Sequence, residues 1–441
     1  MRLLIIDAGA HALDFAIRAE DAGHQVKWFK RWTRQNEASG KGLVEIVPEF
    51  EPWLRWAELI FLTDNTYYLK QIDAFRREQV CAVVGPTQET ADWEIDRSKG
   101  QAVLQKHGIA VPASKEFHDY DKAIEYVKKE DRRFVSKPSG IIEDKALSYV
   151  SETPEDMVYM LARWKKMGKH KAPFLLQEFI SGIEMAVGGW FGSGGWNTGW
   201  CENFEFKKLM NDNLGVATGE QGTVLRYVKH SKLADKVLKP ITPELERLDY
   251  TGYIDVNCII DDKGQPWPLE FTTRPGWPTF NIQEPLHQGD PVEWLMDLAS
   301  GVDGKTALCD RIAVGVVLTI PDYPYSHLTR KEVLGVPVYG LTTVRPHVHP
   351  CALMAGEAPQ RTNGAIKNAP MMVTAGDYVL VMTATSPTVR ESALTAYRRL
   401  RRLTVPNSPM WRTDIGRRLA KELPKLQSHG YAMAMSYSPP G

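Results

Sequence analysis

Residues 2–29, RLLIIDAGAHALDFAIRAEDAGHQVKWF, decide the class of fold. The apolar run Arg2–Ile6 predicts a buried strand, which stops at the turn residues Asp7–Gly9. Ala12–Ala22 is amphipathic with helical spacing, and Gln25–Phe29 is again strand-like. A strand, a tight turn, a helix and a second strand in this order predict the start of a parallel α/β sheet.

The same alternation continues beyond this opening. Strand-like runs recur at Leu59–Leu62 and Ala82–Val84, and Gly85-Pro86 closes the second of them. Such runs, separated by helical stretches, extend a parallel sheet with helices on its faces. We therefore expect an N-terminal α/β domain over residues 1–95.

Further α+β structure is predicted downstream. Asp96–Gly108 and Lys122–Lys129 predict helices, and Phe134–Lys137 predicts a strand. Tyr253–Ile260 and Trp267–Phe271 flank an Asp-Lys-Gly turn and predict an antiparallel pair. The expected fold class is therefore a multidomain combination of α/β and α+β structure.

A glycine-rich segment and a last α+β region complete the outline. Residues 188–199, GGWFGSGGWNTG, carry six glycines in twelve positions, but the interleaved aromatic residues favour a hairpin over a flexible linker. Strands are expected at Ala313–Thr319 and Tyr378–Thr383. They predict a C-terminal α+β domain over residues 313–441.

Composition excludes several classes of protein. The 441 residues, 43% hydrophobic and 24% charged, are long enough for about three domains and are neither disordered nor fibrous in character. Lys plus Arg (54) equals Asp plus Glu (54), so no overall basic field draws the chain to nucleic acid or an anionic membrane. Five widely spaced cysteines without a CxxC pair predict reduced thiols. The short apolar run at the N-terminus resembles neither a signal sequence nor a membrane span, so we expect a cytoplasmic protein.

The run Gln177–Glu184, QEFISGIE, resembles the hinge of ATP-grasp ligases. In that superfamily the backbone of one strand binds adenine, and a glutamate a few residues further on holds the ribose hydroxyls. Glu184 falls at that place. Taken alone, the run slightly favours an ordinary strand and turn that carry exposed carboxylates.

Stretches across the whole chain extend the resemblance. They occur in the order and approximate spacing of the glycinamide ribonucleotide synthetase (phosphoribosylamine–glycine ligase) family: GPTQETADWEIDRSKGQAVLQKHGIAVPA, FVSKPSG, LLQEFISGIEMAV, TGEQGTV, DYTGYIDVNCIIDDKGQPWPLEFTTRPG, AVGVVLTIPDYP and WRTDIGRRL. The most telling piece is Arg412–Gly416, RTDIG, since a generic ATP-grasp ligase does not need it. The chain thus resembles a divergent member of this family.

The resemblance implies a domain order and a reaction. The N-terminal domain would take the amine, residues 96–312 would form the central ATP-grasp pair of domains, with a smaller ATP lid at about 113–185, and residues 313–441 would follow. ATP would phosphorylate a carboxylate, and an amine would attack the acyl phosphate to give an amide, ADP and phosphate. This chemistry needs cations around the phosphates and carboxylates that hold Mg²⁺, or Mn²⁺ in its place.

Several residues match ATP-binding positions of the family. Lys137 matches the lysine that faces the α- and β-phosphates. Arg97 matches, by its distance to Gly108, the phosphate-contacting arginine of carbamoyl phosphate synthetase, another ATP-grasp enzyme, with Lys99 as the alternative if the alignment slips by two residues. Lys145 belongs to the loop over the triphosphate, which is glycine-poor here. The adenine and ribose positions fall on Gln177, Glu178, Phe179, Ile180 and Glu184.

The expected metal site centres on Glu270, which stands in Leu-Glu-Phe-Thr where the family has a magnesium-binding Glu-x-Asn. Thr272 replaces the asparagine, and a hydroxyl is a weaker neutral ligand than an amide carbonyl, so binding of two metal ions is in question. Asp255 and Asn257 share a face of the neighbouring strand, and either could complete the site.

The first turn departs from the family at a substrate position. The family's turn, GNGGREHAL, is associated with the phosphoribosylamine site, whereas here it is the shortened Asp7–Leu13, DAGAHAL, which offers Gly9 and His11 as substrate-binding candidates. Backbone N–H groups at a helix start suit an anion. An acidic residue in a shortened turn therefore argues against an unchanged phosphate pocket.

Three further candidates follow from the resemblance. Glu205-Phe-Lys-Lys replaces the family's Asp-His-Lys-Arg and leaves Lys207 as a candidate catalytic residue. Arg274 and Gly276 match the family's residues after the metal motif, and an arginine suits bidentate capture of a carboxylate or an acyl phosphate.

Three hypotheses for function stay open at this point. The first is a ligase that joins an amino acid, by default glycine, to phosphoribosylamine. The second keeps the ATP chemistry with a different amine or a modified nucleotide, and the third is an inactive nucleotide-binding relative, motivated by Thr272 and the glycine-poor loop. The basic tract Arg398–Arg402 is the candidate for RNA binding, but a solvated helix face explains it. We expect small-molecule substrates, no nucleic-acid or membrane partner, and a monomer or homodimer.

Overall fold

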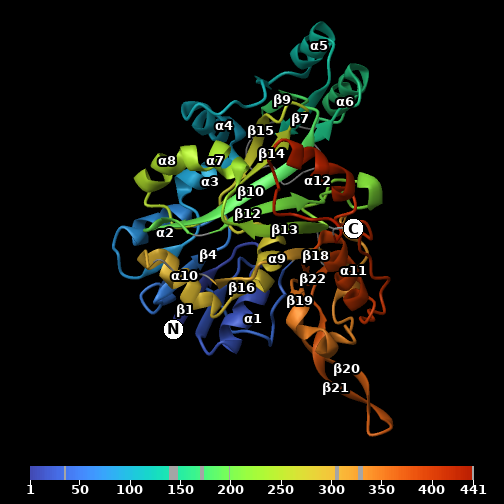
Figure 1. Ribbon diagram of the computed structural model, residues 1–441. Coiled ribbons are helices and arrows are strands. Elements are labelled where there is room, and N and C mark those ends of the chain that lie inside the picture. Colours follow the sequence, from blue (N-terminus) through green and yellow to red (C-terminus); the bar gives the residue numbers. More distant parts are fainter. Residues whose placement is uncertain are drawn as a thin grey trace.

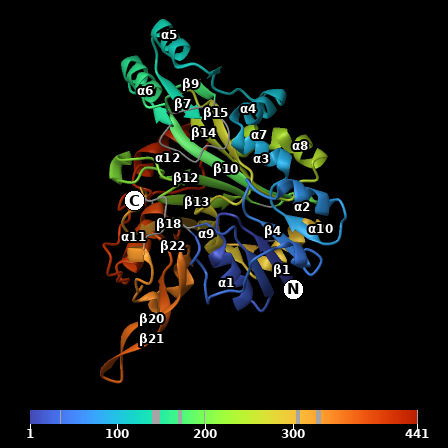
Figure 2. The same ribbon diagram turned by 180° about the vertical axis from the view of Figure 1, so that it is seen from behind.

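The computed structural model describes residues 1–33, 36–138, 148–168, 173–197, 199–302, 307–325 and 331–439. Figures 1 and 2 show a central body with two projections at opposite ends. One projection is a lobe that carries α5 (Tyr120–Glu130) and α6 (Pro154–Lys166), and the other is a hairpin of β20 (Leu353–Thr362) and β21 (Ala365–Thr374).

The N-terminal sheet has five parallel strands in the order β3-β2-β1-β4-β5. They are β1 (Arg2–Ile6), β2 (Gln25–Phe29), β3 (Ile46–Val47), β4 (Leu59–Leu62) and β5 (Ala82–Val84), and the accompanying helices are α1 (Leu13–Asp21), α2 (Leu69–Arg76) and α3 (Gln88–Ile95). β4 is buried throughout, as strands covered by helices on both faces are. The predicted α/β opening is confirmed, and the strand order reverses between β1 and β4.

A second sheet of four antiparallel strands forms the lobe. Its order is β6 (Ser114–Phe117), β9 (Phe174–Glu178), β7 (Phe134–Pro138) and β8 (Tyr149–Val150), and α4 (Arg97–Lys106) leads into it. The lobe has its own core, which includes Phe134, Leu161 and Phe174. α6 starts at a capping box, because Thr153 and Asp156 each accept a hydrogen bond from the other's backbone N–H.

The largest sheet has eight strands in a row, with β11 added at the side. Its order is β15 (Pro266–Thr272), β14 (Gly252–Ile260), β10 (Ile183–Gly192), β12 (Trp200–Glu205), β13 (Gly222–Val228), β18 (Ile312–Thr319), β22 (Tyr378–Ser386) and β19 (Val348–Pro350). β11 (Gly195–Trp196) pairs with β10, so the glycine-rich segment forms the predicted hairpin. The predicted antiparallel pair is β14 and β15.

This sheet runs across the expected domain boundary at residues 312 and 313. β13 and β18 pair, with Thr223 opposite Gly315. A Cβ atom at Gly315 would lie 2.2 Å from Ile282 of α9 (Thr279–Gln283), so glycine at this position lets α9 lie directly on the sheet. The C-terminal part therefore shares one continuous sheet with the part that precedes it.

The remaining helices surround this sheet: α7 (Lys232–Val237), α8 (Thr242–Arg247), α10 (Pro291–Ser300), α11 (Val389–Leu400) and α12 (Leu419–Ser428). Two short strands, β16 (His287–Gln288) and β17 (Ala307–Leu308), pair with each other. The five cysteines are unpaired, and Cys201 and Cys258 are buried. Arg398 and Arg399 of the basic tract stand in the last turn of α11.

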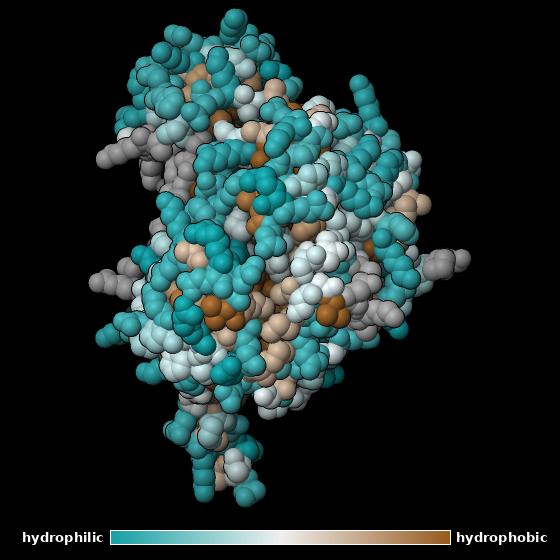
Figure 3. Space-filling view, turned by 90° about the vertical axis from the view of Figure 1, so that its left-hand side faces the viewer, coloured by the Kyte–Doolittle hydropathy of each residue, from teal (hydrophilic) through white to brown (hydrophobic). Residues whose placement is uncertain are grey.

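The surface is mostly hydrophilic on the two projections, and apolar side chains gather nearer the middle of the face shown in Figure 3. β20 and β21 pair in register from Leu353 opposite Thr374 to Thr362 opposite Ala365, and most of their residues away from the body are exposed. Within the described ranges, every helix is too short or too polar to cross a bilayer.

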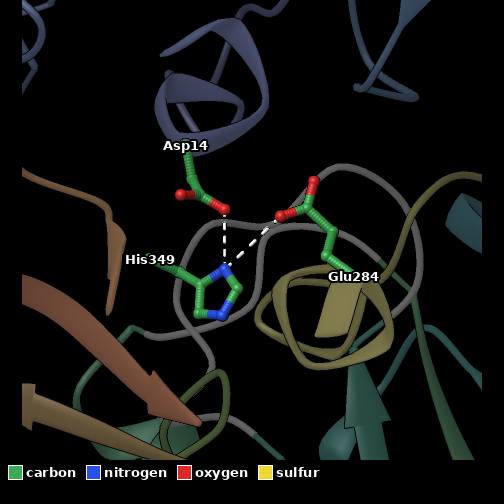
Figure 4. Close-up of side chains that lie close together, drawn as sticks. All are labelled: Asp14, Glu284 and His349. Carbon is green, nitrogen blue, oxygen red and sulfur yellow. Dashed lines mark hydrogen bonds and ion pairs between the residues drawn. The ribbon is translucent and has the colours of Figure 1, made fainter. Parts of the chain in front are cut away.

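A buried ionic cluster joins the N-terminal sheet to the C-terminal part (Figure 4). Asp14 of α1, Glu284 and His349 of β19 point toward one another, and His349 Nδ1 lies 2.7 Å from Asp14 Oδ2 and 3.4 Å from Glu284 Oε2. On the other side of the ring, His349 Nε2 lies 2.9 Å from Thr383 Oγ1. Arg18 Nε lies 2.9 Å from Asp14 and 3.0 Å from Glu284, so one cation contacts both carboxyl groups.

This cluster predicts a dependence of stability on pH. Burial and the charge of Asp14 raise the pKa of Glu284 from 4.5 to about 8. A proton held more tightly in the folded state stabilises it, and that contribution is present below pH 4.5 and is lost as the pH rises through about 8. We expect the melting temperature to fall as the pH is raised across this range, and Glu284→Gln, which does not titrate, to flatten the fall.

Differential scanning calorimetry at a series of pH values measures this effect. Glu89→Gln, an exposed carboxylate of α3 paired with Arg247, is the matched control and should keep the wild-type slope. Equal slopes for the wild type and Glu284→Gln would show that this carboxyl does not control the pH dependence.

Candidate active site

Opposite charges meet where α4, β10, β12 and β15 come together. Lys207 Nζ, just beyond β12, lies 2.9 Å from Glu205 Oε2, 3.0 Å from Glu184 Oε1 and 3.6 Å from Glu270 Oε1. Arg97, the first residue of α4, forms an ion pair with Glu270. Between 17% and 33% of each side chain is exposed, so this charged cluster is open to a ligand.

Sheet register fixes the carboxylate end of the cluster. β14 pairs with β15 so that Asn257 stands opposite Glu270 and Asp255 stands opposite Thr272. Directly opposed residues share one face of a sheet, with Cβ atoms about 4.5–5.5 Å apart. The four candidate metal ligands from the two strands therefore stand on one face, beside Lys207.

Arg97, and not Lys99, belongs to this cluster. Lys99 Nζ lies 2.7 Å from Asp92 Oδ2, and 55% of its side chain is exposed. Two successive steps of about 100° around a helix turn these two side chains to nearly opposite sides. Of the two alternatives, the structure therefore brings Arg97 to Glu270.

The electrostatics of the cluster suit a polyanionic ligand. Burial would raise the pKa of Glu270, but Arg97, Lys207 and Lys137 outweigh this effect and hold the pKa well below its ordinary value. Burial would likewise lower the pKa of Lys207, but three surrounding glutamates hold it well above 10.5. Glu270 is therefore ionised and Lys207 is charged across the neutral range.

Lys137 stands at the end of β7, on the lobe side of the same site. Burial lowers its pKa to about 7, and repulsion from Arg97 and Lys207 acts in the same direction. The charge of Glu270 opposes the shift. A lysine in this state gains a full charge when an anion such as a triphosphate binds beside it. Lys145 lies outside the described residues.

Glu270 and Asn257 offer the oxygens that a Mg²⁺ ion prefers. Asn257 Nδ2 donates a hydrogen bond to Glu205 Oε2 at 3.0 Å, and its buried Oδ1 has no partner in the described part of the chain. Asp255 Oδ2, by contrast, accepts two side-chain hydrogen bonds, and burial raises its pKa to about 7. The donor set therefore fits the metal at Glu270 and Asn257, next to the Thr272 hydroxyl.

Two carboxylates beside the cluster were not assigned a role from the sequence. Glu205 makes the closest contact with Lys207. Glu220 is 4% exposed, its Oε1 has no partner among the described residues, and burial together with Glu205 raises its pKa well above 4.5. Glu220 stands in TGEQGTV, a stretch that carried the family resemblance, and Glu205 stands in EFKK, which replaces the family's Asp-His-Lys-Arg, so an acidic residue in these two stretches was the available signal.

The hinge connects the lobe to the large sheet. Its expected residues are Gln177 and Glu178 at the end of β9, followed by Phe179 and Ile180; Gln177 is buried, and the other three are half-buried. The Phe179 ring lies under the Arg133 guanidinium, with 3.7 Å between the guanidinium carbon and the ring centroid. Further on, Glu184 of β10 contacts Lys207. The hinge therefore leads from the lobe directly to the charged cluster.

The candidate substrate residues lie on the side toward the N-terminal sheet. Arg274 is paired with Glu94 of α3, at 2.9 Å, rather than with a carboxylate of the cluster. Gly276 precedes Trp277, whose ring centroid lies 5.6 Å from that of His11. A Cβ atom on Gly9 would lie 2.4 Å from the His11 ring, so glycine is what allows the ring to fold back over the turn.

Comparisons with known proteins agree with this geometry. Residues 96–279 match the family described as the phosphoribosylglycinamide synthetase ATP-grasp (A) domain. The chain is 24% identical over 361 residues to a phosphoribosylamine–glycine ligase of Ralstonia nicotianae, covering 79% of this chain and 81% of the relative. It is 26% identical over 363 residues to the Allochromatium vinosum ligase of the same name, covering 80% and 81%.

Solved structures show the same fold. The crystal structure of a phosphoribosylamine–glycine ligase from Thermotoga maritima superposes with a TM-score of 0.70 at 19% identity, covering 94% of this chain and 100% of that one. An L-amino acid ligase from Bacillus licheniformis superposes with a TM-score of 0.58 at 15% identity, covering 92% and 99%.

Removal of the Glu270 charge should abolish turnover. Glu270→Gln exchanges an ionised candidate metal ligand for a neutral isostere and releases Arg97 and Lys207 from their shared partner. We expect a fall of about 10²–10³ or more in the rate of ADP release, with unchanged circular dichroism. Glu89→Gln serves as the control and should retain the wild-type rate. Near-normal turnover of Glu270→Gln would remove this residue from the site.

Lys137 should take up a proton when ATP binds. Its pKa of about 7 leaves it mostly neutral at about pH 8, and the phosphates of ATP favour its charged form. Titration calorimetry in buffers of different ionisation enthalpy should show uptake of up to about one proton per ATP. Lys137→Met should lose this uptake and bind ATP more weakly. The same uptake in both proteins would assign the proton to another group.

Proposed function

We propose that this chain, a divergent ATP-grasp ligase homologous to the phosphoribosylamine–glycine ligases, joins an amino acid to an amine through an acyl phosphate. The observation that carries the proposal is the meeting of Arg97, Lys207 and Glu270, which sets phosphate-binding cations beside a metal-binding carboxylate. The alignments with the ligases cover 74–80% of the chain, so the likeness extends beyond the ATP-binding part.

The proposed reaction has two steps. A carboxylate oxygen attacks the γ-phosphorus of ATP, the bond from this phosphorus to the β-phosphate oxygen breaks, and ADP leaves. The amine nitrogen then attacks the acyl carbon, the bond from carbon to the phosphate oxygen breaks, and the nitrogen gives up a proton as the amide forms. Phosphoryl transfer of this kind depends chiefly on positioning and on charge stabilisation.

The side chains divide these tasks. Arg97, Lys137 and Lys207 balance the negative charge of the triphosphate and of the leaving ADP. The hinge residues Gln177–Ile180 bind the adenine, and Glu184 holds the ribose. Arg274, kept in position by Glu94, and Gly276 border the carboxylate that is activated.

Glu270 and Asn257 would hold Mg²⁺, with Thr272 beside them, and Mn²⁺ accepts the same oxygen ligands. When bound, the ion neutralises charge that develops on the transferred phosphoryl group. A cytoplasmic location fits five unpaired cysteines, which a reducing compartment preserves. The oligomeric state, monomer or homodimer, stays a prediction.

Hydroxylamine tests the first step independently of the true amine, because it traps acyl phosphates as hydroxamates. We expect ATP, Mg²⁺ and one amino acid of a panel that includes glycine to give hydroxamate and ADP in equal amounts. Glu270→Gln should give neither product. ADP release that does not depend on any amino acid, or ATP binding without turnover across the panel, would contradict the ligase assignment.

A further inference from the structure

A second polar site lies at the carboxyl ends of β1 and β4, away from the charged cluster. In open α/β sheets, ligands bind outside these strand ends at the point where the strand order reverses. Asp7 follows β1 and Thr63 follows β4, and Thr63 N donates to Ile6 O at 3.2 Å, so the two side chains stand beside each other. Trp277, which follows the metal-binding strand β15, reaches this edge and places its Nε1 3.4 Å from Thr63 O.

The Asp7 carboxylate occupies the start of α1. Its Oδ2 accepts hydrogen bonds from the backbone N–H of Ala12 at 2.7 Å and from Trp28 Nε1 at 3.1 Å, and the side chain is fully buried. Ala12 immediately precedes α1, and the first N–H groups of a helix are where phosphates and other anions bind. The Asp7 carboxylate occupies this anion-binding position, and its negative charge repels a second anion.

The neighbouring cation, Lys30, donates its hydrogen bonds to backbone carbonyl groups. Lys30, whose charge interacts with Asp7, donates hydrogen bonds to Asn36 O at 2.5 Å, Glu37 O at 3.0 Å and Ser39 O at 2.6 Å. An ammonium group has three hydrogens, so all of them hold this loop. Lys30 therefore has no hydrogen left to offer a phosphate at these strand ends.

In the described part of the chain, two oxygens at these strand ends lack hydrogen-bond donors. Asp7 Oδ1 and Thr63 Oγ1 are both buried and have no partner among the described residues. A carboxylate oxygen only accepts, so a ligand must present hydroxyl or amino hydrogens to it. The rings of His11 and Trp277, 5.6 Å apart, supply aromatic surface of the kind that packs against a sugar ring or a cationic amine.

We propose that this site at the ends of β1 and β4 binds the acceptor amine and that Asp7 selects acceptors that carry hydroxyl or amino groups and no phosphate. An aminosugar is an example of this class. The inference rests on the proposed function, because it assumes that the chain transfers an activated carboxylate to an amine. It adds the class of acceptor and the residue that sets it.

Matched acceptors that differ only in a phosphate group test the inference. D-glucosamine is compared with D-glucosamine 6-phosphate, and ethanolamine with phosphoethanolamine, using the amino acid that gives the most hydroxamate. We expect the wild type to prefer the unphosphorylated member by at least about tenfold in kcat/KM, since like charges placed together are costly. Asp7→Asn keeps an oxygen for Ala12 N–H without the charge and should lose most of this preference.

Asp21→Asn, at the exposed far end of the same helix, is the control and should keep the wild-type preference. Hydroxamate formation separates the two proposals, because without it the ligase assignment itself fails. With hydroxamate present, equal or better use of the phosphorylated members, or use of neither member, would overturn the inference. So would an unchanged preference in Asp7→Asn.

A measurement on the wild type covers the case in which Asp7→Asn does not fold. Inorganic phosphate is added as an inhibitor against varied D-glucosamine at fixed, saturating ATP. We expect no competition with the amine, because the start of α1 is filled. Competitive inhibition at millimolar phosphate would show that the anion binds at the start of α1 and would overturn the inference.

Discussion

The balance of charge among Lys207, Arg97 and Glu270 is the constraint on which the arrangement of the active site depends. The three residues come from the segment after β12, the start of α4 and β15, so their contacts fix three distant parts of the chain in one place. Without a ligand, cations and carboxylates neutralise one another. Groups already aligned in this way need little reorganisation when ATP and a metal ion arrive, which is the condition for electrostatic catalysis.

Much of the fold could be predicted because the strands concerned are apolar runs bounded by turn residues. β1 and β4 are of this kind, and their burial follows from their composition. The pairing of β13 with β18 could not be predicted, because residues so distant in sequence carry no local signal of partnership. β20 and β21 were not predicted for another reason: half of their residues are exposed and few are buried, so neither an apolar run nor a clear alternation of polar and apolar residues marks them.

The candidate site, too, could be predicted from the sequence only in part. Glu270, Lys137 and Lys207 stand in short motifs that define their chemistry, and sequence alone singled them out. The choice between Arg97 and Lys99 required knowledge of where α4 begins, because that position decides which side chain faces Glu270. The N-cap residue Asp96 fixes this start. The pairing of Arg274 with Glu94 joins two elements far apart in the chain and depends on how they pack. Sequence motifs thus indicated the candidate residues, whereas the partners of these residues could be identified only from the three-dimensional structure.

The continuous large sheet also limits how such a protein can be rebuilt by recombination. A chain divided after residue 312 would leave β13 as an open edge, and its unpaired backbone groups would invite pairing with other chains. A foreign C-terminal segment could replace the present one only if it supplied a strand that matched β13 in register and a small residue beneath α9, as Gly315 does now. The C-terminal part therefore has to evolve together with the ATP-binding part rather than as an exchangeable module.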